Sequence, residues 1–177
     1  MTIEIDGAQG EGGGQVLRTS LTLATCTGQD IIVKNIRAGR SRPGLLRQHL
    51  CAVRSAAAIS NATVSGDELA LQRVTFSPGA IKAGEYEFKI GSAGSTTLLM
   101  QTVMPALLRA EGESRIRLEG GTHNGSAPSV DFVEQAYLPT LARAGVEIRS
   151  RLITHGFYPN GGGTWEIAVR PWRSPKP

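Results

Sequence analysis

The sequence has few cysteines, no long hydrophobic run and no segment with the pattern of a secretory leader, and each of these features disfavours a class of protein. Its two cysteines, Cys26 and Cys51, have no CxxC or Cys/His spacing, which disfavours structural zinc and indicates reduced core thiols. No segment approaches the ~18 consecutive apolar residues of a membrane span, and the chain opens directly on a strand pattern, unlike a leader. We therefore expect a cytoplasmic protein without a membrane partner.

The residue patterns of common hydrolases are also absent. The sequence has no Ser/His/Asp or Cys/His arrangement and no pair of carboxylates at a useful spacing, so nucleophilic hydrolysis has no support. The histidines, His49, His123 and His155, are isolated along the chain. No two of them are close enough in sequence to suggest a metal site.

Size and charge favour a folded protein with an anionic partner. The 177 residues, 40% of them hydrophobic, can bury the core of one large domain or two small ones. The net charge of +4 favours an anionic ligand. Much of the arginine lies in one short span, as Arg37, Arg40, Arg42, Arg47 and Arg54.

Hydrophobic periodicity predicts the same order of elements twice. In the first half we expect strands at 3–6, 31–36, 63–64 and 74–76, and helices at 15–27 and 45–60. In the second half we expect strands at 86–90, 115–118, 146–152 and 164–169, and helices at 96–110 and 130–144. Pro105 should kink or divide the first of these two helices.

This order predicts an α/β fold, more closely an α+β sandwich of tandem β-α-β-α-β-β repeats whose helices pack on mixed four-stranded sheets. The repeats occupy 1–82 and 83–171, and 172–177 form a short proline-rich tail. Coincidental alternation of strands and helices is the other interpretation. The glycine-rich turns that open both halves favour duplication, and they predict a site at equivalent strand-to-helix turns.

The most informative segment is the first of these turns, at 6–15. Between Asp6 and Gln15 it contains five glycines and one carboxylate, Glu11, and it joins a strand to a helix. Glycine lets backbone N–H groups approach an anion, and the helix start adds a positive dipole end. A carboxylate among such donors would repel the anion unless a divalent cation lay between them. The alternative is a plain tight turn, because neither the P-loop spacing nor a clean GxGxxG is present.

The basic loop at 36–49 has the composition of a phosphate clamp. Arginine binds phosphate bidentately, and the glycine and proline residues of the loop can hold several guanidinium groups together. A solvated charge run is the alternative. No aromatic residue is interleaved with these arginines, which favours a phosphate end over a single-stranded tract.

Two residues outside this loop could join the site. Arg18 lies near the start of the first helix and could reach the same anion, although it could equally be an ordinary surface arginine. Gln101 lies on a mostly apolar helix, where a buried amide needs partners or a ligand. The alternative is a helix-capping or exposed glutamine.

Five segments resemble the N-terminal half of an RNA 3′-terminal phosphate cyclase. They lie at 6–15, 36–49, 91–97, 120–124 and 155–163, and the resemblance covers nearly the whole chain. Family membership implies an ATP-dependent reaction that turns an RNA 3′-phosphate into a 2′,3′-cyclic phosphodiester. AMP is carried first by an enzyme histidine and then by the RNA, before the vicinal 2′-hydroxyl attacks.

The resemblance also implies roles for individual residues. Glu11 would hold Mg²⁺ or Mn²⁺ at the ATP phosphates, and Gln101 and Pro128 would line the nucleotide site. The RNA end or the ATP phosphates would be bound by Arg18, Arg37, Arg40, Arg42, Gln48 and His49. The loop at 124–129 departs from relatives that have Asn-Pro and a second proline.

The larger departure is length. Family members are roughly twice as long, with a third repeat, a small inserted domain and a nucleophilic histidine in the half that this sequence lacks; no histidine here matches that motif. We therefore expect no catalytic residue in this chain and little activity from it alone. Its expected partners are ATP, RNA with a 3′-phosphate, and either a second copy of itself or the missing half. A non-catalytic RNA-binding or assembly relative and a degenerate truncated product are the alternatives.

Overall fold

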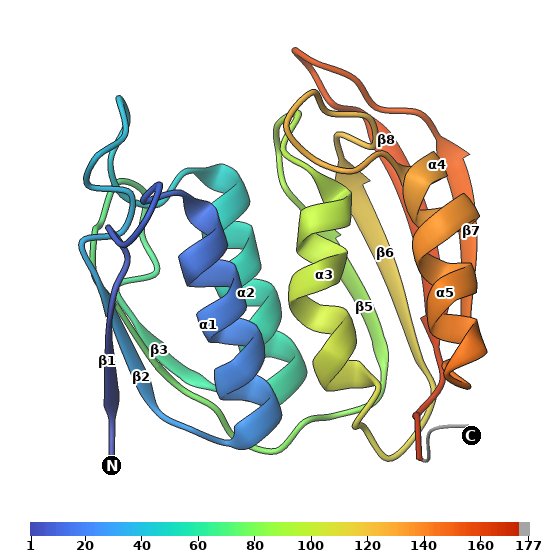
Figure 1. Ribbon diagram of the computed structural model, residues 1–177, viewed down its shortest axis with the longest axis horizontal. Coiled ribbons are helices and arrows are strands. Elements are labelled where there is room, and N and C mark those ends of the chain that lie inside the picture. The colour runs from blue at the N-terminus through green and yellow to red at the C-terminus, as the bar shows by residue number, and fades with distance from the viewer. Residues whose placement is uncertain (174–177) are drawn as a thin grey trace. The chain divides into compact units, whose positions relative to one another are not determined.

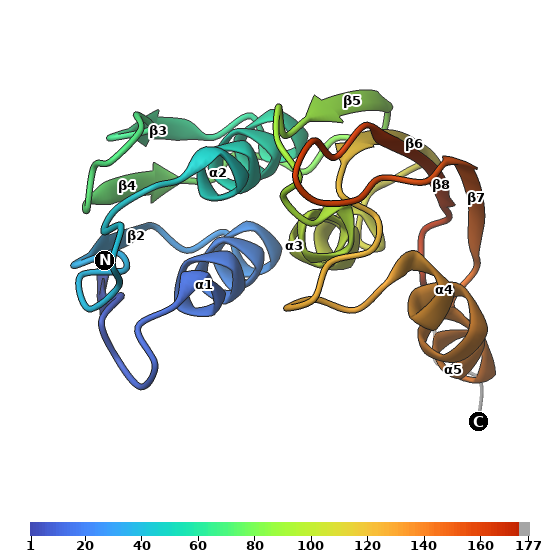
Figure 2. The same cartoon turned by 90° about the horizontal axis from the view of Figure 1, so that it is seen from above.

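The chain forms two compact units, Met1–Ile81 and Lys82–Pro177. The computed structural model describes residues 1–173, so the end of the predicted tail, 174–177, lies outside the described part. Each unit has a four-stranded sheet with helices on one face (Figures 1 and 2). The predicted α/β class is thereby confirmed. No helix in the described residues is long and apolar enough to cross a bilayer.

The first unit follows the β-α-β-α-β-β order. Its elements are β1 (Ile3–Asp6), α1 (Gly14–Thr27), β2 (Ile31–Lys34), α2 (Arg47–Ser60), β3 (Thr63–Ser65) and β4 (Val74–Ser77). The sheet order is β1-β2-β4-β3. β1 and β2 are parallel, and β4 runs antiparallel to both β2 and β3.

The second unit repeats this topology. Its elements are β5 (Glu85–Lys89), α3 (Thr96–Leu107), β6 (Ser114–Gly120), α4 (Val130–Phe132), the π-helical turn η1 (Val133–Tyr137), α5 (Leu138–Arg143), β7 (Ile148–Thr154) and β8 (Gly163–Val169). The order β5-β6-β8-β7 again has one parallel pair, β5 with β6, and two antiparallel pairs. Identical topology supports the predicted duplication.

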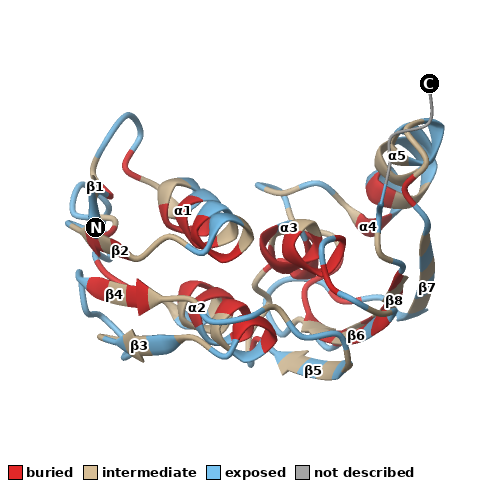
Figure 3. Cartoon of the chain, turned by 90° about the horizontal axis from the view of Figure 1, so that it is seen from below, coloured by how far each residue is buried: buried red, intermediate tan, exposed pale blue. Residues whose placement is uncertain are grey.

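The core of each unit lies between helices and sheet (Figure 3). In the first unit, α1 buries Leu17 and Leu21 at helical spacing, while Val33 and Phe76 of the sheet are fully buried. Alternate residues of β2 and β4 face this core, as expected for a sheet covered on one face. In the second unit Trp165 of β8 is fully buried, and its Nε1 donates to Ser150 Oγ at 2.6 Å.

Both helices expected in the second half differ from the prediction. The first runs through Pro105 undivided and ends at Leu107 instead of residue 110. The second is broken by the π-helical turn, after which the N–H of Leu138 donates to the carbonyl of Val133, five residues earlier. Pro139 lies at the start of α5. Because proline lacks an N–H, it cannot continue the regular i to i−4 bonds.

Parallel pairing places the important loops at one edge of each sheet. The glycine-rich loop after β1 and the basic loop after β2 emerge together, and the N–H of Gly7 donates to the carbonyl of Lys34 at 2.7 Å. The corresponding loops after β5 and β6 also share an edge, where β7 ends as well. In Figure 1 each loop cluster can be followed at the strand ends of its own unit.

The start of the predicted tail is held to the second unit. The backbone N–H of Trp172 donates to Leu108 O at 2.8 Å, and its indole Nε1 donates to Ala144 O at 3.1 Å. No further element forms at 171–173.

Candidate functional site

The first turn of α1 is not capped by a side chain. Its N-cap residue is Gly13, which has no side-chain oxygen to accept a hydrogen bond from the first N–H groups. The first turn also contains no acidic residue. These N–H groups lack partners within the helix and form the positive end of its dipole. The helix start therefore offers donors to an anion.

Arg18 is buried beside this helix start without a carboxylate partner. The residue is 7% exposed. Its Nη2 donates to Gln15 Oε1 at 2.8 Å, whereas Nε is buried with no hydrogen-bond partner. Burial lowers the pKa of Arg18, but a guanidinium remains charged in proteins. A buried cation without a counter-ion is unfavourable, so a bound anion would stabilise this arrangement.

The ring of His49 faces the same point from α2. The backbone N–H of Leu46 donates to His49 Nδ1 at 3.2 Å, as it would to the acidic or amide residue of a capping box. The neutral ring must then carry its proton on Nε2. A Cβ at Gly14 would lie 2.2 Å from this Nε2 and 2.9 Å from Arg18 Nη1. Glycine is therefore required where the two side chains meet α1.

His49 is neutral at physiological pH. Burial, followed by the charges of Arg37 and Arg18, lowers the pKa of His49 to about 4. The residue is 7% exposed, in agreement with burial as the main cause. At neutral pH this ring can offer an anion one N–H from Nε2, but no positive charge.

The basic loop contributes Arg40 to this group and uses Arg37 to hold its own shape. A Cβ at Gly13 would lie 3.2 Å from Arg40 Nη2. Arg37 has a left-handed backbone, with φ of 56°, and its Nη1 donates to the carbonyls of Arg42 and Gly44. Burial, and secondarily the charge of Arg40, lower the pKa of Arg37. Arg37 thus braces the loop that presents Arg40.

The structure brings some of the predicted site residues together and leaves others apart. Arg18, Arg40 and His49 meet at Gly13 and Gly14. Arg42 is exposed, and the bond it receives from Arg37 is to its backbone carbonyl. Gln48 precedes His49 in the first turn of α2 and is half-buried. Gly14 has no distinguishing signal in the sequence, because its close contacts arise only in the fold.

Glu11 is a lone carboxylate beside this group. Its side chain is 94% exposed and its Oε2 lies 3.3 Å from Arg40 Nη2. Within residues 1–173 no group of three or more His, Cys, Asp or Glu residues could hold a metal ion. Mg²⁺ often uses one or two carboxylates when substrate phosphates supply further oxygens. Glu11 therefore fits a cation that arrives with phosphates, and does not fit a permanently bound metal.

The corresponding turn in the second unit is closed. Ser95 caps α3, because its Oγ accepts from the N–H of Leu98 at 3.2 Å. The two helix starts therefore differ in their caps, and the expectation of a site at both turns stays a prediction. Of these two turns, the one before α1 has no capping side chain at its N-cap.

Gln101 and Pro128 belong to this second unit. Gln101 is exposed, so the buried amide considered from the sequence is wrong and the exposed alternative holds. Pro128 is also exposed, and its carbonyl accepts from Thr97 Oγ1 at 2.7 Å. Thr97 and Gln101 are four residues apart on α3, so they share a helix face.

Two histidines that are isolated in sequence meet in the fold. The rings of His123 and His155 stack with centroids 5.2 Å apart, and His123 Nε2 lies 3.0 Å from Asp131 Oδ2. The loops that carry them follow β6 and β7, which end at the same sheet edge. The predicted topology already placed the ends of β6 and β7 at one sheet edge, and therefore these two histidines near each other. Their spacing in the sequence alone did not reveal this.

A family model and individual relatives both match this chain, and they name the same family. Residues 9–177 match the family model described as RNA 3′-terminal phosphate cyclase. Proteins named RNA 3′-terminal phosphate cyclase from Salmonella enteritidis PT4, Salmonella gallinarum and Salmonella typhimurium LT2 are 57% identical over 169 residues, which is 96% of this chain and 50% of each relative. The chain thus spans about half the length of the curated relatives it matches. It belongs to the RNA 3′-terminal phosphate cyclase family.

Proposed function

We propose that the first unit binds the 3′-terminal phosphate of RNA at the start of α1. We further propose that it does so as part of an ATP-dependent enzyme that converts this phosphate to a 2′,3′-cyclic phosphodiester through adenylylated intermediates. The observation that carries the proposal is Arg18, a buried cation with an orphaned Nε beside an uncapped helix start. The family name specifies the phosphate end as the anion.

Each residue of the group has a separate task in binding. Arg18 and Arg40 offset the two negative charges of a terminal phosphate, and the N–H groups of the first turn of α1 point at its oxygens. His49 donates from Nε2 without adding charge. Arg37 holds the loop closed through its carbonyl bonds.

Charge neutralisation serves the cyclisation chemistry. Ring closure requires the vicinal 2′-hydroxyl to approach a phosphorus that bears negative oxygens, and fixed cations reduce that repulsion. The reaction needs a leaving group on phosphorus, which AMP supplies. A divalent cation at Glu11 would offset the charge of the ATP phosphates during binding.

Within the second unit, we assign contacts with the nucleotide to Gln101 and Pro128. An exposed amide and a proline ring can contact an adenine edge and face without ionic groups. Thr97 fixes Pro128 on the face of α3 that carries Gln101. This assignment rests on the resemblance and on exposure of both side chains.

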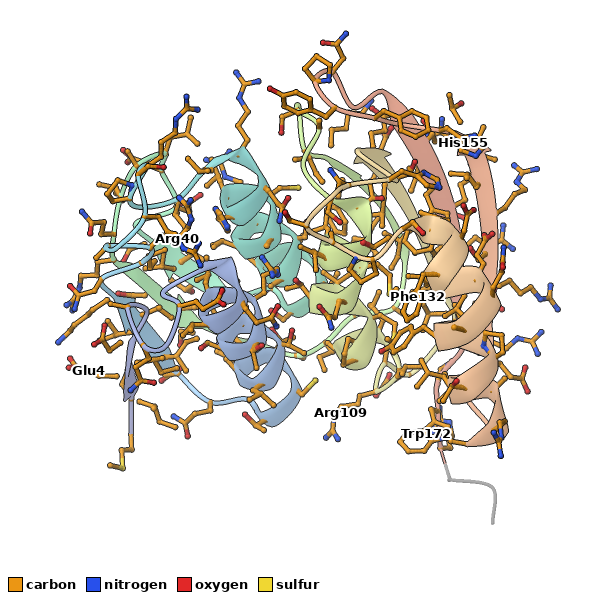
Figure 4. All side chains as sticks on the ribbon, turned by 45° about the horizontal axis from the view of Figure 1, so that its top comes forward. Glu4, Arg40, Arg109, Phe132, His155 and Trp172 are labelled. Carbon is orange, nitrogen blue, oxygen red and sulfur yellow. The ribbon has the colours of Figure 1, made fainter. Side chains whose placement is uncertain are left out.

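The test compares short single-stranded RNAs that end in a 3′-phosphate or a 3′-hydroxyl. The wild-type chain should prefer the phosphate. Arg18→Ala should weaken that preference by about 1.5–3 kcal/mol, which is roughly 10- to 150-fold in Kd, as expected for a charge-assisted bond. Arg109→Ala is the control, because Arg109 is an exposed arginine at the end of α3 (Figure 4). Equal binding of both RNAs by the wild type would refute the proposal.

A further inference from the structure

Three aromatic rings form a stack in the second unit. His123 and Phe157 have centroids 5.3 Å apart and His123 and His155 5.2 Å, with interplanar angles of 30° and 28°. His155 and Phe157 are nearly parallel, at 5° and 6.2 Å. We call His123, His155 and Phe157 the aromatic stack. Phe157 is 55% exposed and His155 is also exposed, so ring surface remains open to a further planar group.

His123 is fixed within the stack on both ring nitrogens. Its Nδ1 lies 2.8 Å from Thr122 Oγ1, and its Nε2 lies 3.0 Å from Asp131 Oδ2. Thr122 is itself fully buried and bonded to the backbone of Gly156. The ring therefore has little freedom to rotate.

The backbone of Phe157 is held by its loop. The N–H of Phe157 donates to Gly161 O at 3.1 Å, and the N–H of Gly161 donates back to Phe157 O at 2.7 Å. Gly161 has a left-handed φ of 79°, and a Cβ there would lie 2.7 Å from Ser92 O. The loop is thus seated on the turn before α3. An aromatic surface that is rigid before binding loses little entropy when a ligand stacks on it.

The aromatic stack lies at the sheet edge of the second unit that corresponds to the edge carrying Arg40 and the start of α1 in the first unit. His123 follows β6 as the basic loop follows β2, and the shared topology makes these positions equivalent. Figure 4 shows His155 beyond the ends of β7 and β8. One repeat thus carries guanidinium groups at this edge, and the other carries flat rings.

We propose that the aromatic stack is a binding surface for a nucleobase of single-stranded RNA. The inference rests on the proposed function for its RNA. Aromatic and imidazole rings stack on any base, which gives affinity without selecting sequence. The basic loop has no Phe, Tyr or Trp to perform this task.

The experiment uses the 177-residue chain and a fluorescein-labelled single-stranded RNA, with fluorescence anisotropy as the readout. Phe157→Ala should weaken binding roughly 5- to 100-fold, whereas Phe157→Trp should retain it. Phe132→Ala is the matched control, since Phe132 is the same residue at the same 55% exposure on α4. An RNA of the same length with abasic riboses should bind the wild type and Phe157→Ala equally.

Three results would overturn the inference. The first is that Phe157→Ala binds RNA as tightly as Phe132→Ala does. The second is that Phe157→Ala weakens binding of the abasic RNA as much as binding of the RNA with bases. The third is that Phe157→Ala weakens binding of ATP but not of RNA. The comparison is made with 3′-hydroxyl as well as 3′-phosphate RNA. If the wild type does not prefer the phosphate, the proposed function fails, while the effect of Phe157 on RNA with bases still tests the stack.

Discussion

His49 should make the stability of the chain depend on pH between about 4 and 6.5. Its pKa is about 4 in the folded protein and about 6.5 in an unfolded chain. As pH falls, the unfolded state therefore takes up a proton first, and the folded state is progressively disfavoured. The effect is absent above about pH 7, grows through the window, and is complete below the folded pKa.

The expected size follows from the two pKa values. A difference of about 2.5 units corresponds to about 3 kcal/mol when both states are protonated, and to about 2 kcal/mol at pH 5. His49 is 7% exposed, so solvent screening does not reduce this greatly. A phosphate bound between Arg18 and His49 would offset the guanidinium charges that help to lower the pKa, and should move it upward.

The assay is urea unfolding from pH 4 to 8, with His49→Gln as the matched variant. Glutamine is uncharged and can still accept from the N–H of Leu46, as in a capping box. The wild type should lose about 2 kcal/mol more than the variant between pH 7.5 and 5. NMR titration of the His49 ring gives the folded pKa directly. A ring that titrates near 6.5, or parallel pH curves for the two proteins, would refute the reasoning.

Three further predictions concern Gly14, Glu11 and the reaction of the chain with ATP. Gly14→Ala should lower phosphate affinity and cost about 1–3 kcal/mol of stability through overpacking against His49, whereas Gly39→Ala, in open space, should change neither. Glu11→Gln should leave the melting temperature unchanged, because an ion pair this exposed contributes little, while abolishing the dependence of ATP binding on Mg²⁺; retained dependence would remove Glu11 as a ligand. Labelled ATP with Mg²⁺ should give no protein–AMP adduct stable to denaturation, and an adduct would show that this chain holds the nucleophile.

The fold could be predicted because its signals are local and repeated. Alternating apolar residues mark β2 and β4, and glycine or asparagine in the left-handed region ends α1 and α2. The extent of the second helix of the second unit was predicted, but the π-helical turn inside it could not be, since such a turn and a regular α-helix have nearly the same hydrophobic pattern. The end of α3, at Leu107 instead of residue 110, was misplaced because the hydrophobic pattern does not mark where the helix stops.

The site was predictable in composition but not in contacts. Arginine-rich and glycine-rich loops indicated an anion, and parallel strands explain why those loops meet. The sequence could not distinguish Arg40, which faces Gly13, from Arg37, which bonds to its own loop. Nor could it reveal that Arg18 is buried without a counter-ion, because that depends on packing between α1 and α2.

The contrast between the two helix starts leads to a last prediction. Ser95 satisfies the first turn of α3, whereas Gly13 leaves the first turn of α1 open. Gly13 has an extended backbone, with φ of −89° and ψ of −173°, which serine adopts readily. Gly13→Ser should therefore place in the first unit the cap that the second unit already has.

A serine cap should stabilise α1 by a few tenths of a kcal/mol and occupy an N–H group that the phosphate needs. The nearest side-chain atom to a new Cβ is Arg40 Nη2, at 3.2 Å. Because the Arg40 side chain is 42% exposed, it can move to make room for the serine. Stability should thus rise slightly while affinity for 3′-phosphate RNA falls, as measured by thermal unfolding and anisotropy on the same sample. General damage lowers both quantities, so opposite changes identify the N–H groups as ligands. Unchanged affinity in a stabilised variant would mean that the phosphate is held by the arginines alone.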